Sequence, residues 1–108
     1  MTARKRYDAL CDDLLARNDD VELGQMMGMP CVKRGGKMVA GFSRTASGMI
    51  FKLPDESVRE QALALDGAEL FDPSGNGQPF KEWVVVPAVH AGEWERLAEH
   101  ALSLKPAG

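Results

Sequence analysis

The chain has 108 residues, enough for one domain of ordinary size that buries roughly two thirds of the surface of its unfolded chain. Hydrophobic residues make up 44% of the sequence and charged residues 27%, which is typical of a soluble globular protein and excludes wholesale disorder. Thirteen basic and sixteen acidic residues give a formal net charge of -3, too small a value to demand a nucleic-acid or membrane partner.

The sequence also indicates the cellular compartment in which we expect the protein. No apolar run approaches the roughly 18 to 20 residues of a membrane-spanning helix, so we expect no membrane partner. The basic N-terminal segment lacks the apolar stretch and the cleavage site of a secretory signal. The chain has two cysteines, Cys11 and Cys31, whereas a secreted scaffold of this size usually has more. We therefore predict reduced thiols and a cytoplasmic location, with a disulfide between the two as the alternative.

The first element is predicted to be a helix that Thr2 caps and that ends at Asn18–Asp20. Its apolar residues recur at positions i, i+3, i+4, i+7 and i+8 and form one buried stripe: Tyr7, Leu10, Cys11, Leu14 and Leu15. The opposite face is rich in aspartate, and we expect it to face solvent.

Between Val21 and Leu53 the spacing changes to that of strands, with apolar residues interleaved with glycines and basic residues. Gly35-Gly36 is typical of a two-residue hairpin turn, since glycine tolerates the positive φ that such turns require. Residues 43–48 are predicted to form a second, looser turn. We expect an antiparallel meander of three or four strands.

Pro54 is predicted to open a second helix that ends at Asp66-Gly67, because proline suits the first helical position. A short strand at Leu70–Phe71 and a turn-rich loop over residues 72–79 follow. The unbroken apolar run of Trp83–Val86 then indicates a strand that is buried on both faces.

A last helix is predicted from about Ala91 to Leu104. The strands are grouped between helices, so the order α-β-β-β-β-α-β-β-α indicates an α+β fold with an antiparallel sheet. We predict a single domain over residues 1–108, with two layers. Three helices cover one face of a sheet of about five strands.

Three segments resemble those of a known family. The first two are Met26-Met27-Gly28 and Gly35-Gly36-Lys37-Met38. The third begins with Phe71-Asp72-Pro73, continues through Gly77, Pro79 and Lys81, and ends with Trp83-Val84. With them the chain resembles the TfoX N-terminal domain family over roughly residues 5–104. The resemblance implies a two-layer α+β fold similar to secretion chaperones. It also implies a relation to YjbR-like proteins, which are often described as DNA-binding. Full-length TfoX proteins are bacterial competence regulators with a second, C-terminal domain, so this chain is similar to a stand-alone N-terminal domain.

Charge is segregated along the chain. Between Leu23 and Pro54 there are five basic residues and no acidic one, and we call these five the basic meander: Lys33, Arg34, Lys37, Arg44 and Lys52. We expect them to form one surface that binds nucleic-acid phosphates or another anionic partner. The alternative is that these charges protect the exposed face and edge of the sheet from aggregation.

A second candidate site follows the turn-rich loop. Lys81 and Trp83 are predicted to line a small-ligand pocket, in which Lys81 reaches an anion and Trp83 forms a wall. The alternative is that Trp83 only anchors the last strand in the core. Methionines, which adapt to irregular contacts, gather in the meander and favour a homodimer or a protein-partner interface: Met26, Met27, Met29, Met38 and Met49.

Nothing in the sequence predicts catalysis, a metal or a cofactor. His90 and His100 are ten residues apart and have no cysteine partner, and Cys11 lies on the apolar stripe. We therefore expect a non-catalytic binding or regulatory module. A small-ligand-binding protein or an unrecognised enzyme is the second hypothesis, and a protein-interaction adaptor is the third.

Overall fold

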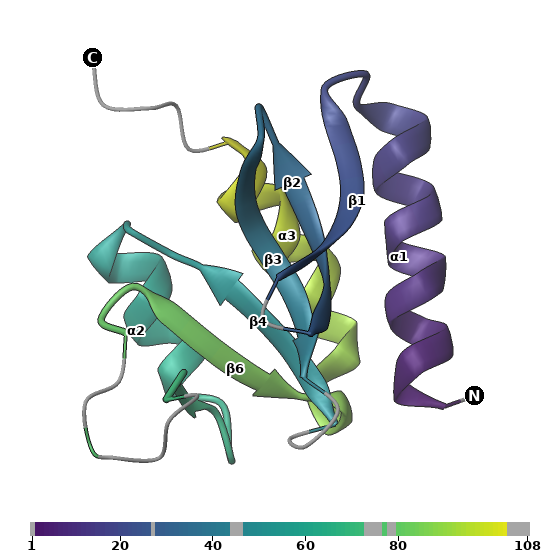
Figure 1. Cartoon of the computed structure of the whole chain (residues 1–108). Coiled ribbons are helices and arrows are strands. Elements are labelled where there is room, and N and C mark those ends of the chain that lie inside the picture. The colour runs from purple at the N-terminus through teal and green to yellow at the C-terminus, as the bar shows by residue number, and fades with distance from the viewer. Residues whose placement is uncertain (1, 27, 44–46, 73–76, 78–79, 104–108) are drawn as a thin grey trace.

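The computed structural model describes residues 2–26, 28–43, 47–72, 77 and 80–103 of the chain (Figure 1). Its helices and strands follow one another in the predicted order. They are α1 (Ala3–Arg17), β1 (Val21–Met26), β2 (Met29–Arg34), β3 (Lys37–Ser43), β4 (Gly48–Lys52), α2 (Glu56–Leu63), β5 (Glu69–Leu70), β6 (Trp83–Pro87), the 3-10 helix η1 (Ala88–Glu93) and α3 (Trp94–Ser103).

The strands form one antiparallel sheet in the order β1-β2-β3-β4-β6-β5, so the predicted α+β class is confirmed. The described residues hold six strands where about five were expected, because the meander between α1 and α2 has four strands, the upper end of its predicted range. β6 pairs with β4, and the short β5 lies on its outer side. The edges of the sheet are therefore β1 and β5.

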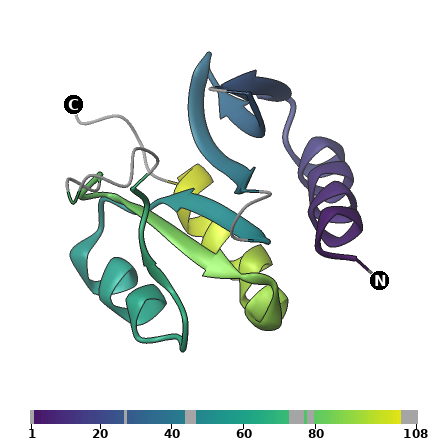
Figure 2. The ribbon, with the colours of Figure 1, turned by 60° about the horizontal axis from the view of Figure 1, so that its bottom comes forward.

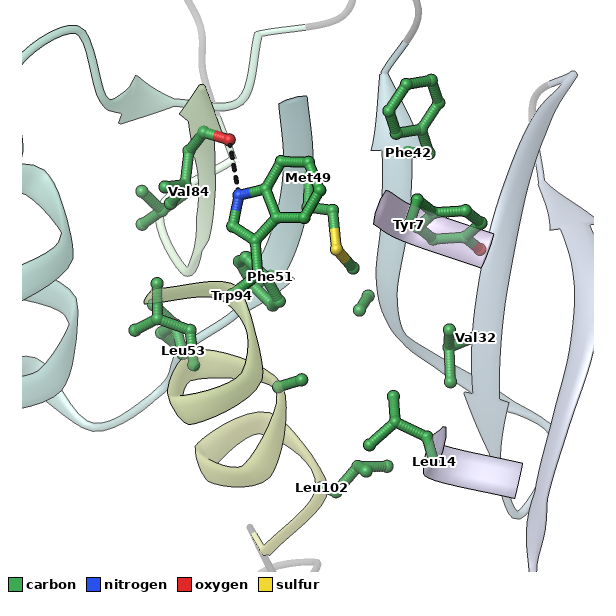
Figure 3. Close-up of a cluster of buried hydrophobic side chains, with 14 of the residues drawn as sticks. Tyr7, Leu14, Val32, Phe42, Met49, Phe51, Leu53, Val84, Trp94 and Leu102 are labelled. Carbon is green, nitrogen blue, oxygen red and sulfur yellow. Dashed lines mark hydrogen bonds between the residues drawn. The ribbon is translucent and has the colours of Figure 1, made fainter. Parts of the chain in front are cut away.

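All three helices cover one face of the sheet, with α3 between α1 and α2 (Figure 1, Figure 2). Alternate residues of the strands point toward the helices and join one buried cluster, which includes Phe42, Met49 and Phe51 (Figure 3). Trp94 is the largest fully buried side chain, and its Nε1 donates to the Val86 carbonyl at 3.1 Å. The one polar atom of this side chain is thus satisfied inside the core.

A second, smaller cluster lies on the other face of the sheet. Ile50, Phe71 and Val85 are buried there, and Met29 and Trp83 pack against them. Because Val84 and Val86 point to the helices while Val85 points away, β6 is buried on both faces, as its apolar run predicts.

Several predicted boundaries were wrong. α2 begins at Glu56, after Pro54, because the Asp55 side chain caps the helix by accepting from the Val58 N–H at 3.2 Å. The last helix begins at Trp94 and follows the 3-10 turn η1, and the short strand lies at Glu69–Leu70. The predicted turn over residues 43–48 and the loop over residues 72–79 fall largely outside the described residues.

Leu15 was expected on the buried stripe of the first helix, yet its side chain is 39% exposed. Tyr7, Cys11 and Leu14 are the buried residues of α1. The buried stripe of α1 is narrower than predicted, because α1 lies at the edge of the sheet, beside β1. The sheet therefore covers only part of the surface of this helix (Figure 2).

Tyr7 and Cys11 lie one helical turn apart on the buried face of α1. Burial raises the pKa of the Tyr7 hydroxyl above its ordinary value and that of the Cys11 thiol from 9.0 to about 11, because the charged forms lose contact with water. Both groups therefore hold their protons more tightly in the folded chain than in the unfolded chain, and this contribution to stability is lost as the pH rises.

We expect the free energy of unfolding to fall as the pH rises above about 9, since the unfolded chain releases the Cys11 proton there and the folded chain retains it to about 11. The contribution of Cys11 is of the order of 2 kcal/mol. Urea unfolding below about pH 9 and above about pH 11 measures this contribution. Cys11→Ala should unfold with a shallower dependence on pH, and an identical dependence in this variant would refute the assignment.

Candidate ligand-binding site

An open cleft of about 750 Å³ lies between the start of α2 and the turn that leads into β6. Its wall contains both Lys81 and Trp83, the residues that the sequence predicts for a pocket. The rest of the lining combines apolar, cationic and acidic side chains: Pro54, Glu56, Arg59, Phe80 and Glu82. Such a surface suits a ligand that has a flat apolar portion and a charged one.

Backbone hydrogen bonds fix the turn that carries Lys81. The Phe80 N–H donates to the Phe71 carbonyl at 2.8 Å. The Leu53 N–H donates to the Glu82 carbonyl at 2.7 Å, which ties the turn to the end of β4. The backbone on both sides of Lys81 is held in this way, while its side chain extends into solvent.

Two aromatic rings line the cleft. Phe80 is 44% exposed, and its ring packs edge-on against the buried Phe71 with 5.9 Å between the centroids. Trp83 is half-buried and packs in part against the smaller cluster. Trp83 thus belongs both to the wall of the cleft and to the packing of the last strand, the two roles that the sequence left open.

Arg59 is the cationic residue of the cleft that the sequence analysis missed. Its Nη1 donates to the Leu53 carbonyl at 3.0 Å and to the Pro54 carbonyl at 3.2 Å, so the guanidinium group is anchored against the end of β4. The side chain is half-buried. No local motif marks this position, because four of the other six cleft residues lie more than 20 positions away along the chain: Phe80, Lys81, Glu82 and Trp83.

Lys52 adds a third cation beside the cleft. It lies directly opposite Trp83 in the pairing of β4 with β6, so the two side chains leave the same face of the sheet. Trp83 is therefore surrounded by three cationic side chains and two carboxylates. The cations are Lys52, Arg59 and Lys81, and the carboxylates are Glu56 and Glu82.

The basic meander does not converge on one surface. Lys33 and Lys52 lie on the face away from the helices, whereas Arg34 pairs in register with the buried Val21 and points to the helix side. Lys37 is exposed beside the hairpin turn, and Arg44 lies outside the described residues.

Arg34 is engaged within the fold. Its Nε donates to the Asp20 carboxylate at 2.7 Å, and its Nη1 donates to the Leu102 carbonyl in the last turn of α3. The hydrogen bond from Arg34 lowers the pKa of the Asp20 carboxyl below its ordinary value. Arg34 thereby links the start of β1 to the end of α3.

The remaining candidates form no site in the described part of the chain. Cys11 and Cys31 are buried and are not bonded to each other. His90 Nε2 donates to the Asp66 carbonyl at 2.7 Å. Among the described residues no group of three histidine, cysteine or acidic side chains is placed to hold a metal ion. No helix formed by these residues is long and apolar enough to cross a membrane.

Comparison with protein-family models, curated proteins and solved structures found no match to this chain. The resemblance to the TfoX N-terminal domain family, and with it the likeness to secretion chaperones, stays a prediction. What this protein binds therefore has to follow from the residues of the cleft and the sheet.

We expect Arg34→Met to lower the free energy of unfolding by roughly 1 to 2 kcal/mol, because both the Asp20 carboxylate and the Leu102 carbonyl lose a charged donor. Lys37→Met removes the same charge at an exposed position and should change stability by less than about 0.5 kcal/mol. Chemical denaturation of the two variants makes the comparison. Equal stabilities would show that Arg34 has no structural role.

Proposed function

We propose that this protein is a non-catalytic binding module whose ligand occupies the cleft between α2 and β6. The ligand carries one anionic group next to a flat apolar group. The observation that carries this proposal is the placement of Arg59 and Lys81 beside the rings of Phe80 and Trp83 in a single open cleft. A bacterial cytoplasmic location and a regulatory role belong to the same proposal.

The two cations offer different contacts to an anion. Arg59 donates from Nη1 to two backbone carbonyls, and among the hydrogen bonds of the described residues no other guanidinium nitrogen of Arg59 is used. Its Nε and Nη2 donors thus remain for a ligand oxygen, on a group that is already held in place. Lys81 supplies a mobile charge at the tip of the fixed turn, able to follow the anion.

The carboxylates limit the charge of the ligand. Glu56 and Glu82 line the same cleft and would repel a chain of phosphates that ran along it. A single phosphate or carboxylate can contact Arg59 and Lys81 while an aromatic portion rests on Phe80 and Trp83. This charge pattern favours a small ligand over a polyanion.

Phenyl phosphate is a suitable probe, because it joins one anionic group to one ring. We expect it to change the fluorescence of the half-buried Trp83 in a saturable way, with Trp94, buried in the core, contributing a constant signal. Lys81→Ala should weaken binding by about fivefold, since one charge-assisted hydrogen bond is lost. Lys5→Ala, which removes an exposed charge from α1, should leave the affinity unchanged.

Trp83→Phe identifies the source of the signal and should remove most of the fluorescence change. Phenol tests the need for the anion and should bind much more weakly than phenyl phosphate. No saturable change with phenyl phosphate, or equal effects of Lys81→Ala and Lys5→Ala, would refute the cleft as the binding site.

A nucleic-acid contact is the second candidate, and it is favoured by the position of Lys33 and Lys52 on one face of the sheet. Because Arg34 is committed to Asp20 and Leu102, this surface offers fewer phosphate contacts than the five cations of the basic meander. We expect any binding of duplex DNA to weaken with salt at a log–log slope of roughly -2 to -3. Fluorescence anisotropy at several salt concentrations measures the slope, and a slope near -5 would contradict this assignment of Arg34.

A further inference from the structure

The edge strand β1 carries a surface that is complementary to itself. We propose that two copies of the chain pair through β1 in antiparallel fashion, around a two-fold axis at Leu23, and so join their sheets. The cleft lies beside β6, near the opposite edge of the sheet, so the proposed pairing does not depend on it.

The direction of the backbone groups of β1 follows from its pairing with β2. Gln25 lies opposite Pro30, which has no N–H, so this pair occupies a position without mutual hydrogen bonds. The neighbouring pair Gly24 and Cys31 is then one that exchanges hydrogen bonds between β1 and β2, so the backbone groups of Gly24 point toward β2. By the alternation of an antiparallel ladder, Val21, Leu23 and Gln25 direct their N–H and C=O groups away from the sheet.

Charge complementarity selects the register. Antiparallel pairing centred on Leu23 places Glu22 of each copy opposite Gly24 of the other. The Lys33 ammonium lies above Gly24: a Cβ built there would be 3.2 Å from Lys33 Nζ. The glycine leaves room for the lysine, and the lysine in turn meets the Glu22 carboxylate of the second copy. The two-fold axis produces this contact twice.

The neighbouring registers bring like charges together. A centre at Glu22 would place the two Glu22 carboxylates opposite each other, and a centre at Gly24 would bring the two Lys33 ammonium groups together. Within the described part of the chain, neither Glu22 nor Lys33 takes part in an ion pair, although they lie opposite each other in register. The second copy supplies the partner that each lacks.

Exposed apolar side chains flank this edge. Leu23 is 48% exposed and would meet its own counterpart across the axis. Leu15 is 39% exposed and lies on the same face of α1 as Arg4 and Asp8, two residues that line a hollow together with Leu23. The axis is perpendicular to the sheet, so both copies of α1 lie on the same side of the joined sheets. The solvent exposure of these leucines therefore decreases in the dimer.

Sedimentation equilibrium of the whole chain tests the proposal, with a reversible monomer–dimer equilibrium as the expected result. Glu22→Lys alone and Lys33→Glu alone should each weaken the dimer about tenfold, because each creates two repulsive contacts. The double exchange Glu22→Lys with Lys33→Glu should restore the affinity of the original chain. Thermal unfolding of each variant at low concentration shows whether the monomer itself has changed.

Gln25→Pro is the second test. Proline removes an outward N–H and leaves the inward bonds of Gly24 intact, so we expect a folded monomer that no longer pairs. Lys81→Ala, in the cleft, should leave the dimer unaffected. A chain that stays monomeric up to about 0.5 mM overturns the proposal. A dimer that persists in Gln25→Pro, or one that the double exchange fails to restore, also overturns it.

Discussion

The pairing of β6 with β4 is the interaction on which the rest of the structure depends. β6 comes from the far end of the chain, yet it lies inside the sheet and contributes Val84 and Val86 to the helix-side core and Val85 to the smaller cluster. Full burial of each such side chain contributes about 1.5 to 3 kcal/mol. The close approach requires Gly48, since a Cβ there would lie 2.4 Å from the Val86 carbonyl oxygen. The same pairing places Trp83 beside Lys52 and so builds one wall of the cleft.

Local periodicity was sufficient to predict the element order, the α+β class and the double burial of β6, because each of these follows from residues close together in the sequence. Lys81 and Trp83 were predicted to lie together for the same reason, since they are two residues apart in the sequence, and both line the cleft. Arg59 was missed because its place in the cleft depends on the packing of α2 beside that turn. Leu15 was misassigned because its burial depends on where the sheet ends.

The dispersal of the basic meander follows from strand geometry. Lys33 and Arg34 are neighbours in β2, and successive residues of a strand point to opposite faces of the sheet. The register of β2 with β3 shifts between Val32 and Lys33, but Lys33 and Arg34 pair with the consecutive residues Met38 and Lys37, so their side chains still leave opposite faces. A cluster of charges in sequence therefore predicts a cluster in space only when the spacing matches the period of the element. In β2 this leaves Lys33 for contacts outside the helix layer and commits Arg34 to Asp20 and Leu102.

The two proposed surfaces are separated by the width of the sheet, because β1 is one edge and the cleft lies beside β6, near the other. Pairing through β1 extends the sheet and leaves both clefts open at its far sides. The proposed pairing would thus leave the affinity of a single cleft unchanged, since no cleft residue lies at the joined edge. It would double the number of proposed sites in one particle and so raise the avidity for a partner that presents two anionic groups at a matching distance. For a binding module with an open cleft, such an arrangement would strengthen binding to a bivalent partner without any new contact at either site.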